Sequence, residues 1–589
     1  MGKLVVGLIV SLWVIPISIL VNSIVPDAYM DEIFHIPQVQ QYCKGNFKSW
    51  DPMITTPPGL YYLSLAHIAS LFPGMLLLQR ISSFTDLCST AILRSVNGAL
   101  AVICSILIYE IIAQLRPALD RRKATVYTIV LSLYPLHWFF TYLYYTDVAS
   151  LVVFLAMYLA SLKKNYVLSA LLGALAVCIR QTNIIWMLFV ACGGVIDMLL
   201  ANRLSVDIQK SNLSISEKDQ ITPTDGFVAK PGIRRRKMKS TLHVPRLSAT
   251  GDDESAFLQS HLSGDLCIFL IFQFLRNAQK DKYTRILLIS GEIIIWWACG
   301  YSMDCMDDCG GLLDEIQYIL VQAWHSKWEL VVSFSPFLFV LVAFVAFVYW
   351  NGSVVLGAKE AHAVSPHFSQ ILYFAMVSAL FSAPFHFTLG HASVLLRSFW
   401  KLRPLSFFLG FVIFAAGLLS VHFFSIAHPY LLADNRHYPF YIWRKVSNIH
   451  QPYSLNLAFL ISYLMTSRPQ DSVSKPAEGY VQQAHLSYPS KQLTELCFAF
   501  LSTGKSRSRI WVLAYFLACA AVLVPTPLIE FRYYTIPFFI FMLNCGIDDI
   551  NKWLLMAILY VVINSFTMYM FLFRSFQWSH ESGVQRFIW

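Results

Sequence analysis

Residues 4–24 read LVVGLIVSLWVIPISILVNSI, and residues 25–38 continue as VPDAYMDEIFHIPQ. The first stretch is long and apolar enough to cross a bilayer, because a helix of about 20 apolar residues matches the hydrocarbon thickness. It lacks a small-residue cleavage site, so we interpret it as a retained signal anchor. Lys3 precedes it and acidic residues follow it, so the positive-inside rule predicts a cytosolic N-terminus.

Apolar stretches of this kind recur along the chain and indicate its class. Of the 589 residues, 57% are hydrophobic and 13% are charged, whereas soluble globular proteins carry about 45–50% and about 25%. This composition predicts an all-α polytopic membrane protein with about 12–14 transmembrane helices, and it excludes soluble, disordered, fibrous and disulfide-scaffold proteins. After the first span we expect spans at residues 92–115, 125–143, 148–162, 166–180, 184–201, 331–350, 368–385, 405–426, 453–467, 509–525, 534–549 and 553–573.

The basic residues predict the topology. The sequence has 44 Lys and Arg against 34 Asp and Glu, and the positive-inside rule places such an excess in cytosolic loops. A basic cluster at residues 116–123 follows the span 92–115. If this cluster is cytosolic, the apolar run 58–78 does not cross the membrane. Residues 25–90 then form one large luminal loop, whose helices lie on the membrane surface or dip into it.

This topology divides the chain into segments. The first helix (1–24) leads into the loop 25–90, and spans occupy 91–202, 331–467 and 509–589, the last with a tail. Between and within these regions we expect segments that do not cross the membrane or whose topology is open. They are a disordered cytosolic loop at 203–262, an insertion or re-entrant segment at 263–330, a luminal loop at 427–452 and a cytosolic linker at 468–508.

Cysteine and metal-binding patterns add little. Most of the 12 Cys lie in apolar runs, where a thiol behaves as a small hydrophobic group. Only Cys43 with Cys88, and Cys305 with Cys309, lie in polar surroundings. The sequence contains no Walker loop, no HExxH motif and no His/Cys cluster with metal-ligand spacing, so we expect no metal and no cofactor.

Five polar clusters fall on the same, luminal side of the membrane in this topology. Charged groups at membrane depth are costly and usually face a polar cavity or a substrate pathway. Their convergence on one set of span ends therefore predicts an active site there. The clusters are Tyr29–His35, Tyr144–Asp147, Arg180–Asn183, His428–Tyr438 and Glu530–Tyr534.

The first cluster holds two adjacent carboxylates, Asp31 and Glu32. Either one can act as a general base, with the imidazole of His35 about one helical turn beyond. The structural alternative is that Asp31 caps a surface helix, where the helix dipole favours its charge. The two interpretations are compatible.

The other clusters also have structural alternatives. Arg532 can bind a lipid phosphate with its guanidinium fork, or it can be an interfacial arginine in an aromatic belt. Asp147 and Arg180 can simply pair across adjacent spans. The stretch from Asp434 to His437 is denser in polar groups than a turn requires, although a solvated loop is the commoner explanation for such a run.

Two longer motifs carry a resemblance to a known family: YMDEIFHIPQ at residues 29–38 and WDPMITTPPGLY at residues 50–61. The chain is similar to the α-1,2-glucosyltransferases of the endoplasmic reticulum. These enzymes use dolichyl phosphate glucose to add the third, terminal glucose to the lipid-linked oligosaccharide of N-glycosylation. The similarity continues through several later motifs and covers nearly the whole chain apart from 203–330. These motifs are Tyr144–Asp147, Arg180–Asn183, Trp350–Gly352, His428–Tyr438, Trp443 with Arg444, and the tail Phe576–Trp589.

The resemblance implies a GT-C glycosyltransferase fold in the endoplasmic-reticulum membrane, with an acidic active-site residue on the first luminal loop. The implied partners are dolichyl phosphate glucose, the dolichyl-pyrophosphate-linked oligosaccharide and the lipid bilayer, with no nucleic acid. Carried onto this chain, the catalytic acid is Asp31 or Glu32, of which we favour Asp31. Arg532 and Tyr533 are then expected at the donor phosphate. The expected substrate-binding residues are His35, Asp147, Arg180, Asp434, Arg436 and His437.

Two other functions remain open at this point. A related transferase that uses dolichyl phosphate mannose would share the spans, the acidic loop and the basic phosphate anchor. A transporter would also have many spans with charged residues, but transporters tend to place these near the bilayer midplane in broken, repeated helices. In this sequence the polar clusters lie at one face and no repeat is evident.

Overall fold

The computed structural model describes residues 2–77, 83–218, 306–360, 367, 369–386, 435–438, 440, 508–526, 528–579 and 583–589. Its contacts divide the chain into two units, Met1–Leu200 with Ser302–Trp589, and Ala201–Tyr301. The elements that build the candidate site belong to the first unit.

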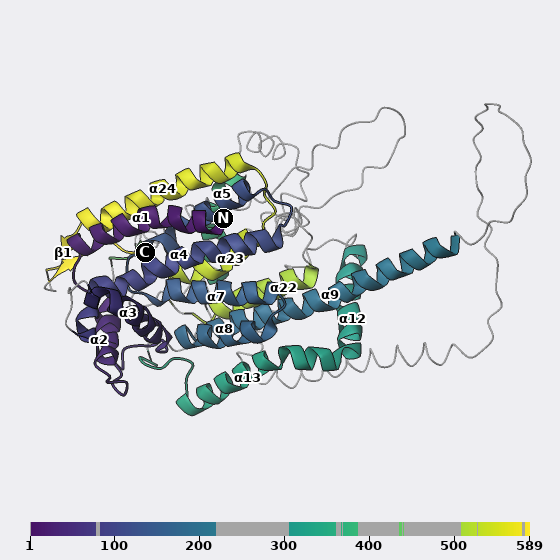
Figure 1. Cartoon of the computed structure of the whole chain (residues 1–589), viewed down its shortest axis with the longest axis horizontal. Helices are drawn as coiled ribbons and strands as arrows, with labels where there is room; N and C mark the ends of the chain where they lie inside the picture. The colour runs from purple at the N-terminus through teal and green to yellow at the C-terminus, as the bar shows by residue number, and fades with distance from the viewer. Residues whose placement is uncertain are drawn as a thin grey trace, which may run out of the picture. The chain divides into compact units, whose positions relative to one another are not determined.

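Most of the long apolar helices of the first unit run side by side, among them α1, α4, α7, α8 and α24 (Figure 1). α1 (Gly2–Ile24) packs against α4 (Thr90–Leu115), α4 against α7 (Thr146–Leu162), and α7 against α8 (Tyr166–Ile179). α13 (Lys327–Asn351) packs against α8, and α24 (Ile550–Phe573) packs against α5 (Arg121–Ser132) and α6 (Pro135–Phe140). Further helices of the described part are α9 (Asn183–Lys218), α12 (Met306–His325), α14 (Ser369–Phe381), α15 (Ala383–His386), α22 (Arg509–Leu523) and α23 (Thr535–Asn544).

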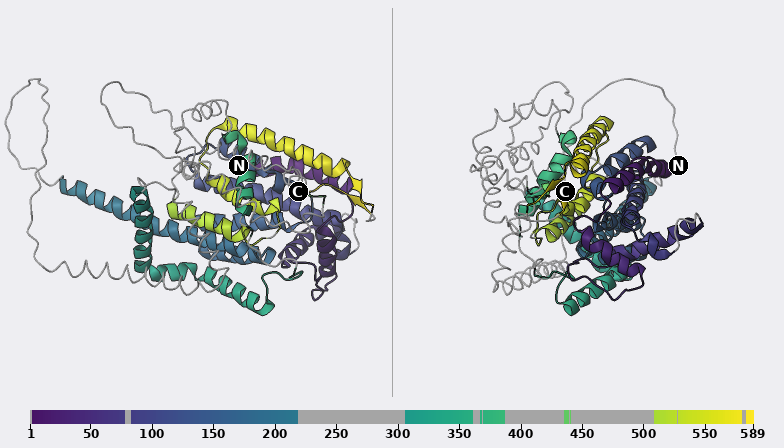
Figure 2. Two further views of the ribbon diagram at one scale, coloured as in Figure 1. Left: turned by 180° about the vertical axis from the view of Figure 1, so that it is seen from behind. Right: turned by 90° about the vertical axis from the view of Figure 1, so that its left-hand side faces the viewer.

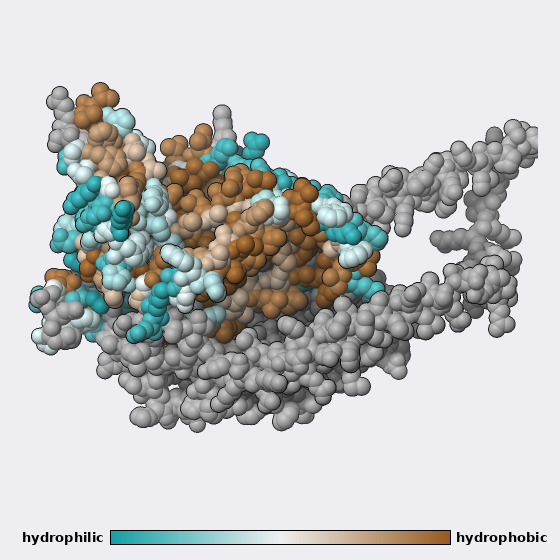
Figure 3. All heavy atoms as spheres, turned by 90° about the horizontal axis from the view of Figure 1, so that it is seen from below, coloured by the Kyte–Doolittle hydropathy of each residue, from teal (hydrophilic) through white to brown (hydrophobic). Residues whose placement is uncertain are grey.

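The apolar character of these helices confirms the prediction of an all-α polytopic membrane protein. Hydrophobic side chains cover the middle of the face seen in Figure 3, and hydrophilic ones gather toward its ends. The expected spans 405–426 and 453–467 lie outside the described residues, so the total of about 12–14 spans stays a prediction. Six described helices are long and apolar enough to cross a membrane: Gly2–Ile24, Gly59–Leu77, Thr90–Leu115, Asn183–Ala201, Lys327–Asn351 and Ile550–Phe573.

The expected span 125–143 is interrupted. It consists of α5 and α6, which are separated at Leu133 and Tyr134. Pro135 at the start of α6 explains the break, because proline has no N–H and disfavours helical backbone at the residue before it. The side chain of Asn564 on α24 donates a hydrogen bond to the Leu133 carbonyl at 2.8 Å, which satisfies a group at the break.

Two helices of the loop 25–90 lie across one end of the bundle. α2 (Glu32–Cys43) and α3 (Gly59–Leu77) run across the ends of the bundle helices, whereas α1 and α4 run along the bundle (Figures 1 and 2). α3 is apolar and long enough to span, so the expectation that 58–78 does not cross the membrane stays a prediction. Gly59 permits its close approach to α8, since a Cβ there would collide with the main-chain oxygen of Cys178.

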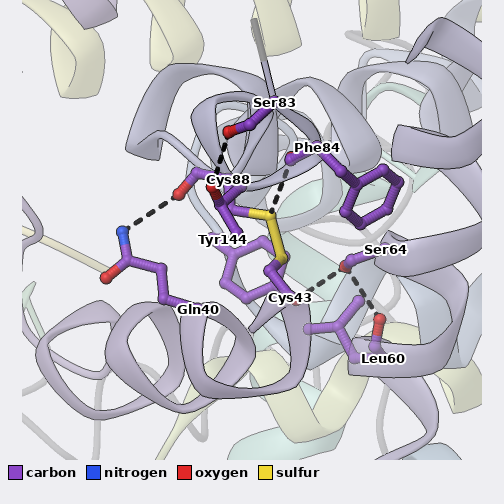
Figure 4. Close-up of a disulfide and its surroundings, with 9 residues drawn as sticks. Gln40, Cys43, Leu60, Ser64, Ser83, Phe84, Cys88 and Tyr144 are labelled. Carbon is purple, nitrogen blue, oxygen red and sulfur yellow. Dashed lines mark hydrogen bonds between the residues drawn. A yellow bond between two sulfur atoms is a disulfide. The ribbon is translucent and has the colours of Figure 1, made fainter. Parts of the chain in front are cut away.

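A disulfide joins Cys43 at the end of α2 to Cys88, which follows the short 3-10 helix η1 (Phe84–Leu87) (Figure 4). The side chain of Gln40 donates to the Cys88 carbonyl at 3.0 Å. A small hydrophobic cluster packs the loop against the bundle: Ile36, Val39, Tyr42, Leu60, Tyr61 and Leu87 of the loop with Leu93, Ala149, Val153, Ala176 and Ile179 of the bundle helices. The disulfide and this cluster hold α2 and α3 in place at the end of the bundle.

Two segment boundaries differ from expectation. We expected a disordered loop from residue 203, but α9 continues as a helix to Lys218. Residues 203–218 contain neither proline nor glycine, so no strong helix breaker stops it there. Within the uncertain segment 263–330, residues 306–325 form α12. Cys305 and most of the expected loop 203–262 lie outside the described residues.

The disulfide predicts a stability difference. Replacing both Cys43 and Cys88 by Ser should lower the thermal unfolding temperature of the purified protein, because a cross-link over 45 residues typically contributes about 2–4 kcal/mol. Cys192→Ser is the matched control, since Cys192 is an exposed free thiol. An unfolding temperature that is equal in the double variant and the control would contradict this prediction.

Candidate active site

Asp31 stands at the start of α2, and its carboxylate is engaged by an arginine. It occupies the N-cap position, but its side chain makes no capping hydrogen bond. Instead its Oδ2 accepts from Nη1 of Arg532 at 2.8 Å. Its side chain is 39% exposed, and Oδ1 makes no hydrogen bond to the described residues. The expected capping role therefore holds for the position of Asp31 and not for its side chain.

The preceding residue holds an uncommon backbone conformation. Met30 has a φ of 57°, a region that residues with a side chain rarely adopt. Such strain persists only where the surrounding structure fixes it, and it often occurs at functional sites. The hydroxyl of Tyr145 accepts from the Asp31 main-chain N–H at 3.2 Å, which is one of the contacts that fix this turn.

Arg532 lies in the 3-10 helix η4 (Phe531–Tyr534), directly before α23. Its Nε donates to Glu530 and its Nη1 donates to Asp31, while the second carboxylate oxygen of Asp147 lies 3.9 Å from Nη1. Only 16% of the side chain is exposed, and its partners are carboxylates of the cluster. Its Nη2 makes no hydrogen bond to the described residues.

Asp147 on α7 and Arg180 at the end of α8 form an ion pair at 2.7 Å. The expected pairing across adjacent spans is therefore present, and it borders the Arg532 cluster. Oδ2 of Asp147 is buried without a hydrogen-bond partner among the described residues. The Arg180 guanidinium lies 5.5 Å from the Tyr533 ring centre and that of Arg532 lies 5.9 Å from it. Tyr533 thus lies within cation–π distance of both.

His35 lies on α2, one turn beyond Asp31. Its Nδ1 is 2.7 Å from the hydroxyl of Tyr61 on α3. Burial lowers the pKa of His35, and the charges of Arg532 and Arg180 act in the same direction against the attraction of Asp31. The imidazole is therefore favoured in its neutral form near pH 7.

The same arginine lowers the pKa of two carboxyl groups. Burial opposes the ionisation of Asp31 and Glu530, but the charge and hydrogen bonds of Arg532 outweigh it, so both pKa values lie below the ordinary range. Their contribution to stability is present above the ordinary carboxyl pKa and is lost as the pH falls through the lowered pKa. Both groups are ionised at neutral pH.

Glu32 does not belong to this cluster, contrary to our inclusion of it among the catalytic residues. Its side chain is fully buried and forms an ion pair with Arg94 at 2.6 Å. The same carboxylate accepts from the main-chain N–H groups of Tyr29 at 3.0 Å and Tyr144 at 2.6 Å. A carboxylate occupied in this way has a structural role, because no atom of it is exposed to a substrate.

Arg94 is the important residue that the sequence did not single out. All five of its N–H groups find acceptors: both oxygens of Glu32, the Asn22 side chain, and the carbonyls of Val25 and Asp27. It therefore joins the end of α1, the start of α2 and the first turn of α4. A charge inside an apolar span signals a buried partner or a functional site, and this signal was present in the run 92–115.

The polar stretch near residue 436 is only partly described, and Asp434 lies outside the described residues. Arg436 donates to the Gln585 side chain at 2.9 Å and its guanidinium lies 4.7 Å from the Trp578 ring centre. These contacts hold the hairpin of β1 (Phe576–Gln577) and β2 (Val584–Gln585), so Arg436 has a structural role there that we had not expected. His437, in contrast, lies close enough to Asp31 and Glu530 to stabilise their charges.

The cluster can perform proton transfer and anion binding. It combines Asp31, Glu530 and Asp147 with the guanidinium groups of Arg180 and Arg532. In the part of the chain that the structure describes, no three His, Cys, Asp or Glu side chains are grouped to hold a metal ion. Among the described residues, Oδ1 of Asp31 and Nη2 of Arg532 make no hydrogen bond, so both can bind a substrate.

The fold is that of an all-α, polytopic membrane protein, and its family is of the GT-C glycosyltransferase type. Residues 25–543 match the model of the DIE2/ALG10 family, and the chain belongs to this family. The resemblance found in the sequence motifs is therefore confirmed.

Several relatives of this chain share the name Dol-P-Glc:Glc(2)Man(9)GlcNAc(2)-PP-Dol alpha-1,2-glucosyltransferase. The protein of Arabidopsis thaliana is 49% identical over 100% of both chains. That of Mus musculus is 30% identical over 96% of this chain and 93% of its own, and one of Homo sapiens is 29% identical over the same shares. No solved structure matches the chain.

The different surroundings of the two adjacent carboxylates predict different mutant phenotypes. Glu32→Gln should lower the unfolding temperature and the yield of monodisperse protein, because breaking a buried ion pair typically costs about 3–5 kcal/mol. Asp31→Asn should lower both much less, since Asp31 is partly exposed and an exposed ion pair contributes little. Equal thermal stability of the two variants would contradict the structural role of Glu32.

Proposed function

We propose that this protein transfers glucose from dolichyl phosphate glucose to the diglucosylated lipid-linked oligosaccharide and forms an α-1,2 linkage, the last step of N-glycan precursor assembly. The names of the relatives support this donor and acceptor. The observation that carries the proposal is the Asp31–Arg532 pair, in which a partly exposed carboxylate adjoins a guanidinium. A glycosyl transfer from a lipid phosphate needs both groups, a base and an anion-binding cation.

The stereochemistry sets the division of labour. The donor is β-linked and the product is α-linked, so the reaction inverts the anomeric carbon in one displacement. Asp31 removes the proton from the 2-hydroxyl of the terminal acceptor glucose while that oxygen bonds to the anomeric carbon. The bond between the anomeric carbon and the phosphate oxygen breaks, and dolichyl phosphate leaves with the electron pair of that bond. Arg532 stabilises the phosphate charge by charge-assisted hydrogen bonds.

Accessibility distinguishes Asp31 from the other acids of the site. The side chain of Asp31 is 39% exposed, against 20% for Glu530 and 7% for Asp147. A general base must reach the proton that it removes. Glu530 and Asp147 instead hold Arg532 and Arg180 in place. We assign Tyr533 to the donor phosphate, and His35 and His437 to the orientation of the sugars. We retain Asp434 as a substrate-binding candidate on the family resemblance.

The ion pair also couples donor binding to the strength of the base. Without donor, Arg532 holds the pKa of Asp31 below its ordinary range. A donor phosphate on Arg532 partly neutralises the guanidinium, and burial then raises the pKa of Asp31. The carboxylate therefore becomes a stronger base only when the leaving group is in place.

The active site faces the lumen of the endoplasmic reticulum in this proposal. Supporting it, the Cys43–Cys88 disulfide lies on the same loop as Asp31, and disulfides persist in oxidising compartments such as this lumen. The sequence topology, with basic residues on the opposite side, favours the same orientation.

Cells that lack the protein should accumulate the diglucosylated lipid-linked oligosaccharide, because its terminal glucose cannot be added. Mass spectrometry of extracted lipid-linked oligosaccharides measures this, and re-expression of the wild-type chain should restore the triglucosylated species. Accumulation of a mannose-deficient precursor instead would show that the donor is dolichyl phosphate mannose.

Variants of the ion pair should separate the two roles. Asp31→Asn should reduce kcat by about 10²–10⁴-fold, the usual contribution of a general base. Arg532→Ala should reduce kcat/KM for the donor by about 10²–10³-fold, as expected for a lost anion-stabilising group. Lys359→Ala, which removes an exposed cation bonded to Asn351, is the control. Wild-type kinetics in either site variant would remove that residue from the mechanism.

The pH profile tests the coupling between the two residues. Because Arg532 lowers the pKa of Asp31, the acid limb of kcat/KM due to Asp31 should lie below the ordinary carboxyl range. In Arg532→Gln the main opposition to the burial effect is lost, so the limb of the residual activity should move to higher pH. An unchanged limb would contradict the assignment of the titrating group to Asp31.

A further inference from the structure

Residues 584–589 (VQRFIW), which we call the strap, follow α24 and pair with residues near His437. The Ile588 N–H donates to the Arg436 carbonyl at 2.9 Å, and the Tyr438 N–H donates to the Ile588 carbonyl at 3.0 Å. His437 and Ile588 form a parallel β-bridge. The strap therefore supplies main-chain partners to the segment that carries His437.

A single hydroxyl group connects the strap to the loop of Asp31. The Tyr29 hydroxyl donates to the Arg586 carbonyl at 2.7 Å and accepts from the Arg586 N–H at 2.8 Å. Tyr29 is 8% exposed, and its own N–H donates to Glu32. Two hydrogen bonds thus join the strap to Tyr29, and Tyr29 is two residues before Asp31 in the chain.

The other contacts of the strap lie at the end of α24 and beside η4. Arg586 Nη1 donates to the carbonyls of Phe571 at 2.9 Å and Leu572 at 2.8 Å. The Trp589 ring lies 5.0 Å from that of Tyr438 and 6.3 Å from that of Phe531, the neighbour of Arg532. The strap consequently contacts the segments of Asp31, Arg532 and His437 together.

One contact also sets the hydrogen position on His437. Its Nδ1 lies 3.2 Å from the main-chain oxygen of Trp589. A main-chain oxygen can only accept, so Nδ1 carries the hydrogen. This contact fixes the orientation of the His437 ring.

We propose that the strap is a positioning element of the active site: through the Tyr29 hydroxyl and the Trp589 main chain, it fixes the Asp31 loop and His437 relative to Arg532. This inference rests on the proposed function. None of the strap residues needs to touch the substrate. Their effect is on the orientation of groups that do, and small displacements of such groups cost much of the rate.

Tyr29→Phe tests the proposal with the smallest change, because it keeps the ring on Phe571 and removes both hydrogen bonds to Arg586. With purified full-length enzyme, dolichyl phosphate glucose and the diglucosylated acceptor, we expect kcat to fall about tenfold. The donor KM and the unfolding temperature should stay close to wild type. Tyr569→Phe is the matched control, since Tyr569 is 49% exposed on α24, and it should have wild-type kcat.

A second pair of variants tests the other end of the strap. Trp589→Ala should lower kcat, and Trp589→Phe should restore most of it, because an aromatic ring again packs on Tyr438 and Phe531. The proposal is overturned if Tyr29→Phe and Trp589→Ala are folded and keep wild-type kcat. It is also overturned if their kcat losses only match a loss of folded protein. A wild-type enzyme that is inactive with this donor would instead overturn the proposed function.

Discussion

The buried ion pair of Glu32 and Arg94 is the contact on which the arrangement of the site depends. Two charges in an apolar interior are costly unless every hydrogen-bonding group is satisfied. Here all five N–H groups of Arg94 have acceptors, and Glu32 also accepts from two main-chain N–H groups. These acceptors and donors come from the end of α1, the start of α2, α4 and the turn before α7. The Glu32–Arg94 pair therefore holds four segments together, and Asp31 directly precedes Glu32 in one of them.

Adjacent acids in the sequence consequently have opposite roles. Glu32 is buried and structural, whereas Asp31 is partly exposed and bonded to Arg532. The strained turn at Met30 permits the two side chains to reach different partners. On the other side of the site, Glu530 and Asp147 hold Arg532, and Arg180 and His437 complete the polar boundary. The strap then joins the tail of the chain to this assembly. The result is a partly exposed carboxylate beside a guanidinium, which supports the proposed inverting transfer from a lipid phosphate.

The sequence predicted the class of fold because 15- to 25-residue apolar stretches have few alternatives to membrane helices. It also placed the clusters of Asp31, Asp147, Arg180 and Arg532 at one face, since charge asymmetry reports topology. It did not separate Asp31 from Glu32, because burial of a side chain depends on partners distant in sequence, such as Arg94. It did not predict the contacts of Arg436 with Trp578 and Gln585, because these partners are 142 and 149 residues away. Pro135 could have indicated the break in the expected span 125–143. The apolar composition of that stretch pointed instead to one continuous helix.

The central claim is that Asp31 is the base and that Arg532 holds the donor phosphate. A structure of the Asp31→Asn variant with dolichyl phosphate glucose and the diglucosylated acceptor tests it most directly. We expect the substituted side chain at position 31 to lie about 3 Å from the 2-hydroxyl of the terminal glucose, with the donor phosphate on Arg532. A 2-hydroxyl bound to Asp147 or Glu530, or a phosphate bound away from Arg532, would contradict the account.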